Sequence, residues 1–143
     1  MASQLKVNTL SGVTTAGSIV VTGEGNSTTT NLQQGLAKVW ANVDQLGTAN
    51  IVDSLNMSGI TDNGTGDLSV AINNNMANAT YACAGMTTSS VAGGGSGEDE
   101  GSLTIDTKAN MTASSNRHTS IRNDTDQKLD YDPVCLIYHG ELA

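Results

Sequence analysis

The scarcity of large apolar side chains limits this chain more than any other feature of its sequence. Its 143 residues include no Phe, one Trp and three Tyr, and only 28 of them are Leu, Ile or Val. Ala contributes to the hydrophobic share of 37%, but each Ala removes little surface from water. Ordering a residue costs about 1–2 kcal/mol, so a single copy can bury only a thin core. The composition therefore predicts either partial disorder or a chain that buries surface against neighbouring subunits.

Charge and hydropathy exclude two classes of partner. The net charge of −8 disfavours binding to a phosphate backbone, which requires clustered Lys and Arg. No apolar run approaches the roughly 18 residues of a membrane span. Residues 1–6 also lack the apolar core of a signal peptide. We therefore expect no nucleic-acid partner and no membrane insertion.

The first 30 residues are rich in Ser, Thr and Gly and contain two short apolar pieces. One extended piece covers residues 5–10, and a second, over residues 18–22, lies between two glycines. Neither piece has enough apolar side chains to fold alone, so we expect residues 1–30 to form an extended arm that docks on another protein. The contact would use the apolar side chains of both pieces, which are Leu5, Val7, Leu10, Ile19 and Val21.

Residues 31–48 allow two interpretations. Their apolar positions follow the heptad spacing of a helix, and these are Leu32, Leu36, Val39, Val43 and Leu46. Gly35 opposes such a helix. The alternative is one helical turn over residues 31–34 followed by a strand over residues 37–43. We favour the second interpretation and treat the segment as a connector.

From residue 49 onward the pattern is that of an all-β domain. Leu68, Val70 and Ile72 alternate with small residues, as in a half-buried strand. Residues 51–58 alternate in the same way, and Asn63-Gly64 is a strong hairpin signal because both turn positions favour positive φ. Further strands are expected over residues 81–86, 103–107, 118–123 and 134–139. We predict an antiparallel, jelly-roll-like β-sandwich over residues 49–143.

Few residues could carry chemistry. His118 and His139 are the two histidines, and we expect both at exposed strand ends, without a nucleophile motif. The acidic stretch over residues 124–132 could pair carboxylates for glycoside cleavage, but we interpret it as a solvated loop. Residues 62–67 resemble a calcium loop that lacks its bidentate Glu, so we interpret them as a hairpin turn. We expect no enzyme activity, no metal and no cofactor.

The two cysteines, Cys83 and Cys135, lie among small or apolar residues. We expect two reduced thiols in strands. A disulfide is the alternative, and it would require close Cβ atoms on facing strands. Neither a CxxC motif nor a nearby pair of histidines indicates a zinc site.

Long polar loops on a β domain would also suit a glycan-binding module. Such sites combine polar groups with aromatic rings that stack on sugars. The large aromatic candidates for that contact are Trp40, Tyr131 and Tyr138.

The stretch from Val52 to Tyr81 resembles a module that recurs in structural proteins of marine tailed bacteriophages, especially tail-fibre-like proteins. Its signature is SLNMSGITDNGTGD over residues 54–67. The ending over residues 134–143 resembles the last strand of this family. The opening LKVNTL, residues 5–10, is similar to the start of phage fibre proteins.

The resemblance implies a non-enzymatic virion protein on the surface of a bacteriophage particle, either a short fibre or an appendage of the tail or capsid. It implies a homotrimer with a β-rich knob, held through its N-terminal arm by capsid, portal, adaptor or tail proteins. A trimer agrees with the thin core, since three copies bury surface that one copy cannot. The alternative is a module that binds host-surface glycan, and the two functions can coexist.

Overall fold

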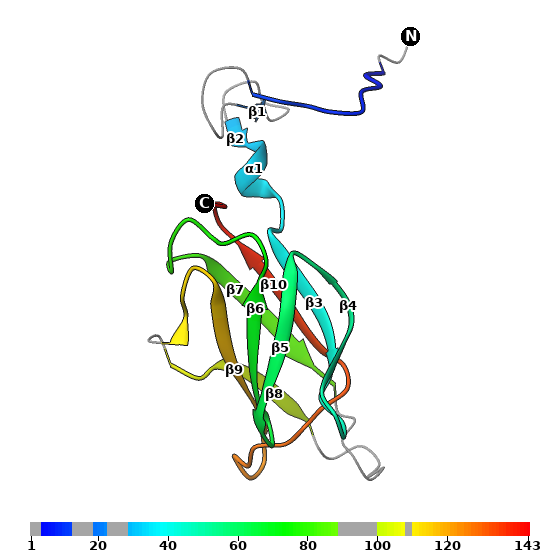
Figure 1. The fold of residues 1–143 in the computed structure, drawn as a ribbon, viewed down its shortest axis with the longest axis vertical. Coiled ribbons are helices and arrows are strands. Elements are labelled where there is room, and N and C mark those ends of the chain that lie inside the picture. Colours follow the sequence, from blue (N-terminus) through cyan, green and yellow to red (C-terminus); the bar gives the residue numbers. More distant parts are fainter. Residues whose placement is uncertain (1–3, 13–18, 23–28, 89–99, 108–109) are drawn as a thin grey trace. The chain divides into compact units, whose positions relative to one another are not determined.

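The computed structural model describes residues 4–12, 19–22, 29–88, 100–107 and 110–143 (Figure 1). The chain divides into two compact units, Met1–Leu36 and Ala37–Ala143. In the first unit, β1 (Val20–Thr22) pairs antiparallel with β2 (Thr29–Asn31), and α1 (Leu32–Gly35) follows directly. The Leu32 amide donates a hydrogen bond to the Ile19 carbonyl at 2.8 Å, which joins α1 to the residue before β1.

The second unit consists of two four-stranded antiparallel sheets that pack face to face (Figure 1). The first sheet has the order β4 (Asn50–Leu55), β3 (Val39–Asp44), β10 (Val134–His139) and β7 (Ala82–Thr87). The second sheet has the order β5 (Met57–Gly64), β6 (Asp67–Ile72), β9 (Ser115–Arg122) and β8 (Gly101–Ile105). The predicted antiparallel β-sandwich is confirmed.

The strand order differs from the jelly-roll-like order that we predicted. Three pairs of consecutive strands are neighbours within one sheet: β3 with β4, β5 with β6, and β8 with β9. In a jelly roll most consecutive strands alternate between the two sheets. The tight turn between β5 and β6 leaves no length for such a crossing, because antiparallel neighbours need only a two-residue connection.

The connector over residues 31–48 contains one helical turn and then a strand. This confirms the interpretation that we favoured, since α1 ends at Gly35 and β3 begins at Val39. Val39 and Val43 fit a heptad, but a spacing of four also places two residues on the same side of a strand. β3 lies between β4 and β10, so the sandwich also includes a strand that we expected to belong to the connector.

The core lies between the inward-facing rows of the two sheets. Inward positions alternate along the strands, so that Val39, Ala41 and Val43 on β3 are buried while Trp40 and Asn42 are half-buried. Because Phe is absent from the chain, tyrosines and a methionine fill the remaining space. The buried apolar side chains are Val39, Ala41, Val43, Leu68, Val70, Ile72, Met76, Tyr81, Tyr131, Val134, Leu136 and Tyr138.

The hairpin between β5 and β6 turns later than predicted. Its turn residues are Thr65 and Gly66, whereas the sequence pattern indicated Asn63 and Gly64. Both glycines have positive φ, 123° for Gly64 and 61° for Gly66. A Cβ at Gly66 would lie 2.5 Å from the Ser120 carbonyl oxygen, so the close approach of β9 requires glycine there.

Asn56 carries the chain from the first sheet to the second. Its φ of 59° breaks the alternating stretch at residues 51–58 into β4 and β5, where we had expected a single strand. The side-chain nitrogen Nδ2 of Asn56 donates to the Lys38 carbonyl at 3.1 Å and to the Asn74 carbonyl at 3.0 Å. Its Oδ1 accepts from the backbone amide of Asn74 at 2.7 Å. Asn tolerates this left-handed conformation better than most residues.

The substitution Val70→Asp tests the position of the core. Val70 is buried in the centre of the sandwich, so an unpaired carboxylate there should cost several kcal/mol and largely unfold a small domain. Ser69→Asp is the matched control, because Ser69 points outward opposite Arg117. Urea unfolding followed by circular dichroism compares the two, and equal midpoints would show that Val70 does not face the core.

Candidate functional site

The predicted glycan-contacting aromatic residues do not form a surface. Tyr131 and Tyr138 are both 0% exposed, so their predicted role as sugar contacts is wrong. They fill the core that a chain without Phe must build from other side chains. Trp40 alone of the three reaches solvent, and it is half-buried on the outer side of β3.

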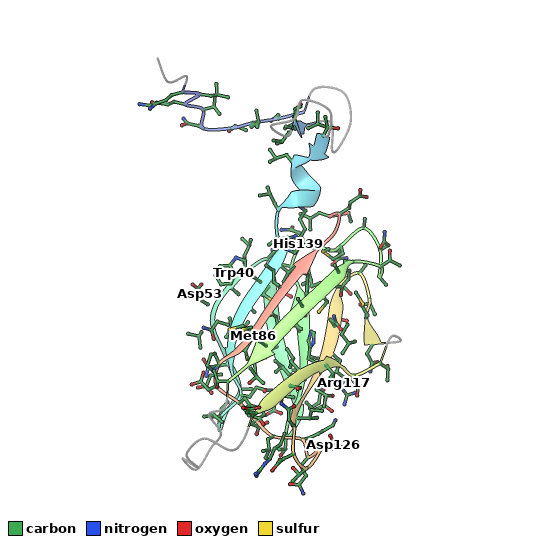
Figure 2. All side chains as sticks on the ribbon, turned by 180° about the vertical axis from the view of Figure 1, so that it is seen from behind. Trp40, Asp53, Met86, Arg117, Asp126 and His139 are labelled. Atoms are coloured by element: carbon green, nitrogen blue, oxygen red, sulfur yellow. The ribbon has the colours of Figure 1, made fainter. Side chains whose placement is uncertain are left out.

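Trp40 belongs to an apolar row that crosses the whole first sheet. At one register, Leu55 on β4, Trp40 on β3, Ile137 on β10 and Ala84 on β7 lie side by side. Met86 stands next to this row on β7 and is 68% exposed. We call these five residues the apolar face. Figure 2 shows Trp40 and Met86 on the first sheet, together with Asp53 and His139.

The predicted anchoring residues lie in the first unit. Leu5, Val7, Leu10 and Val21 are each more than half exposed, and Ile19 is half-buried. Val21 lies on β1, opposite Thr30 of β2. The role of these side chains in docking stays a prediction.

His118 is a core residue, so the prediction of an exposed strand-end histidine is wrong. It lies within β9, is 2% exposed, and places Nε2 2.5 Å from the Tyr138 hydroxyl. Burial lowers the pKa of His118 to about 4, although a hydrogen bond with the Thr104 backbone acts in the opposite direction. Burial also raises the pKa of Tyr138, so at neutral pH the phenol can donate to an uncharged imidazole. His139, by contrast, ends β10 and is half-buried.

β9 brings a polar stripe into the sandwich. Asn116, His118 and Ser120 alternate along it and are all buried, which a hydropathy pattern does not reveal. The Ser120 hydroxyl lies 2.9 Å from Gln45 Oε1 and 2.8 Å from the Leu129 carbonyl. Through Ser120, this stripe ties β9 to the connections that precede β4 and β10.

Asp67 is the centre of an ionic cluster at the start of β6. Its carboxylate accepts two hydrogen bonds from Arg117, at 2.6 Å from Nε and 2.8 Å from Nη2, and a third from Lys128 Nζ at 2.7 Å. The Arg117 hydrogen bonds, together with those of Lys128, hold the pKa of Asp67 well below its usual range, although burial works against them. The Asp67 side chain is nearly buried, whereas both cations are substantially exposed.

The cluster fastens the connection between β9 and β10 to the β5–β6 hairpin. Lys128 comes from that connection, and so does Asp130, whose Oδ1 accepts from the Gly66 amide at 2.6 Å. Asp124 forms a two-point ion pair with Arg122 at 2.5 and 2.9 Å. The acidic stretch over residues 124–132 therefore includes two carboxylates that make structural contacts.

The hairpin that resembles a calcium loop uses its carboxylates internally. Asp62 Oδ1 accepts from the Gly64 amide at 2.8 Å, and Asp67 is engaged by two cationic side chains. Within the ranges that the structure describes, no group of three or more His, Cys, Asp or Glu residues is arranged to hold a metal ion.

Cys83 and Cys135 are free thiols on opposite sides of the first sheet. Cys83 pairs in register with the buried Tyr138 and packs against the core, and burial raises its pKa to about 11. Cys135 pairs with the exposed Met86 and so points outward. Their opposite orientation keeps the two sulfurs apart.

Comparisons with known proteins identify no relative. No protein-family model, curated protein or solved structure matches the chain. None of the helices in the described ranges is long and apolar enough to cross a membrane. The inference of function therefore depends on the geometry and on the resemblance in the sequence.

Acidification tests the burial of His118. Because its pKa is about 4 in the folded protein and about 6.5 when unfolded, the unfolded chain binds more protons between these values. The free energy of unfolding should therefore fall as the pH decreases from 6.5 to 4, by up to about 3 kcal/mol from this residue. In His118→Gln this part of the pH dependence should be absent. Urea titrations at several pH values measure it, and equal slopes for both proteins would contradict the assignment.

The ionic cluster is tested by Asp67→Asn. Losing the carboxylate leaves two cations without their shared partner, and we expect a loss of about 1–3 kcal/mol, because both cations remain partly solvated. Trypsin should also cut faster after Lys128, since the connection is no longer held. Asp124→Asn is the control, because it removes a more exposed carboxylate of the same connection and should change stability little. Unchanged cleavage after Lys128 in Asp67→Asn would contradict the role of the cluster.

Proposed function

We propose that this chain is a non-enzymatic structural protein of a bacteriophage particle. It forms a short fibre or a surface appendage of the tail or capsid, and its N-terminal segment attaches it. The single observation that best supports this proposal is that the two units differ in how far they expose their apolar side chains. Residues 37–143 form a compact sandwich, whereas the described part of residues 1–30 leaves most of its large apolar side chains exposed.

The resemblance to tail-fibre-like proteins supports the same proposal. The resembling stretch, residues 52–81, covers most of β4, all of β5 and β6, and the chain that leads to β7. Its apolar positions Leu68, Val70 and Ile72 are core residues. The stretch is thus a structural unit of the sandwich, as expected for a module that is used repeatedly for its fold.

The engagement of the polar side chains favours a structural role over a hydrolytic one. His118 is bonded to Tyr138 in the core, and Asp67 is paired with two cations. Asp124 is paired with Arg122. A general acid or base needs a group that can reach a substrate, and these three groups are committed to internal contacts.

The assembly that we propose is a homotrimer whose arms contact capsid, portal, adaptor or tail proteins, with the sandwich exposed on the particle surface. A thin core gives such an assembly a physical reason, because contacts between copies bury apolar surface that one sandwich leaves in water. Binding of host-surface glycan is the alternative function. It has less support, because Trp40 is the one predicted aromatic contact that reaches solvent.

Deletion of residues 2–30 tests the role of the arm. The sandwich should keep its circular dichroism spectrum and its melting temperature, because its strands begin at Val39. Incorporation into particles should fall to background, measured by mass spectrometry of purified phage in a complementation assay. The triple substitution of Leu5, Val7 and Leu10 by Asp keeps the length and should have the same effect. Normal incorporation of either variant would contradict attachment through the arm.

A further inference from the structure

The pair Asn63-Gly64 lies outside the turn for which its sequence pattern is typical. It forms the end of β5, directly before the turn, and both of its residues are exposed. Asn63 is also the asparagine of this chain that a glycine follows, whereas every other asparagine precedes a residue that has a side chain. The pair is therefore chemically distinct and accessible to water.

Gly64 leaves its backbone nitrogen sterically unhindered. A main-chain nitrogen can attack the side-chain amide of the residue before it, and a side chain on the attacking residue hinders that approach. A Cβ at Gly64 would meet no atom within 4 Å, so no neighbouring element crowds this peptide. The φ of Gly64 is 123°, a conformation that residues with a side chain rarely adopt.

Asn63 lies in a β-bulge. Between Asp62 and Gly64, β5 advances by two residues while β6 advances by one, so Asn63 is an additional residue on β5. A bulge interrupts the ladder of hydrogen bonds, so the peptide that follows Asn63 can rotate at less cost than one inside a regular strand. The Gly64 amide donates to Asp62 Oδ1 at 2.8 Å. A proton acceptor is thus already in contact with the nitrogen that would react.

From these observations we propose that Asn63 deamidates spontaneously, with Asp62 as the base and water as the second reactant. Asp62 accepts the amide proton of Gly64, and the Gly64 nitrogen forms a bond to Cγ of Asn63. The bond from Cγ to Nδ2 breaks, and Nδ2 leaves as ammonia with the proton that Asp62 returns. Water then adds to either carbonyl of the resulting succinimide ring and opens it. One water is consumed, one ammonia is released, and position 63 becomes aspartate or isoaspartate without any oxidation.

Other asparagines of the sandwich lack this combination of features. Asn116 is 0% exposed, so water does not reach it. Asn56 precedes Met57, and its side chain makes three hydrogen bonds to the main chain. The reaction is therefore expected at Asn63 because of its surroundings as well as its residue type.

The modification reaches the ionic cluster around Asp67. The Asn63 Nδ2 donates to Ser69 Oγ at 2.8 Å and to Asp67 Oδ1 at 3.4 Å. Deamidation removes this donor and places a second carboxylate beside that of Asp67, and isoaspartate also lengthens the main chain at the bulge. The end of the hairpin to which Lys128 and Asp130 attach therefore changes in charge and geometry as the protein ages.

Incubation of the purified full chain at mildly alkaline pH tests the proposal. Peptide mass spectrometry at successive times should show that a hydroxyl replaces the side-chain amino group of Asn63, and an isoaspartyl methyltransferase should label the same peptide. Asn78 and Asn123 are internal controls, because both are exposed and precede Ala and Asp instead of Gly. We expect Asn63 to convert at least several-fold faster than either of them.

The substitution Asp62→Ala tests the base. It removes the carboxylate from the Gly64 amide and should slow the conversion of Asn63 several-fold. Asp53→Ala is the matched control, because Asp53 is exposed on β4 of the other sheet and accepts from a main-chain amide, that of Ser54, at the same 2.8 Å. It should leave the rate at Asn63 unchanged. Both substitutions are at exposed positions, and circular dichroism checks that the sandwich is intact.

The modification site is overturned if Asn63 stays intact, or if it converts no faster than Asn78 and Asn123. The role of Asp62 is overturned if Asp62→Ala leaves the rate unchanged or raises it. This inference is independent of the virion role, because deamidation is measured on purified protein and incorporation on particles.

Discussion

The packing of one alternating apolar row against another is the interaction on which the rest of this structure depends. β3 and β10 supply the row of the first sheet, and β6 supplies the centre of the facing row. Because the chain lacks Phe, tyrosines fill the spaces that remain, and their hydroxyl groups need partners inside the protein. The contact between Tyr138 and His118 follows from that need. A core poor in apolar residues thus brings polar side chains into the interior, where their protonation matters for stability.

The same scarcity explains how the end of the sandwich near the β5–β6 hairpin is held. The connection between β9 and β10 has few large apolar side chains of its own, so hydrogen bonds and ion pairs fasten it. Lys128 and Asp130 attach it to Asp67 and Gly66, and Ser120 attaches it through the Leu129 carbonyl. The sequence pattern predicts a solvated loop for these carboxylates. In the structure they instead hold the connection in position. Among the described residues, the apolar face of the first sheet leaves Leu55, Ile137 and Met86 substantially exposed.

Much of the fold could be predicted from the sequence, because alternation and turn residues report local conformation. The strand β6 (Asp67–Ile72) and the change from helical turn to strand before residue 39 both follow from such patterns. The sequence could not predict whether a polar side chain on a strand points into the core or toward solvent. His118 alternates with Arg117 and Thr119, and nothing in these residue types shows that the imidazole faces the core. The burial of Tyr138 and the pairing of Asp67 depend in the same way on strands that are far apart in the sequence.

We propose that a separate N-terminal segment carries the thin β-sandwich on a phage particle. A density map of the intact phage by electron cryomicroscopy tests this most directly. We predict sandwich-sized density on the outside of the particle, with residues 1–30 in contact with an underlying capsid or tail subunit. A map in which the sandwich itself makes the attachment and residues 1–30 touch no other protein would contradict it, as would particles that lack the chain.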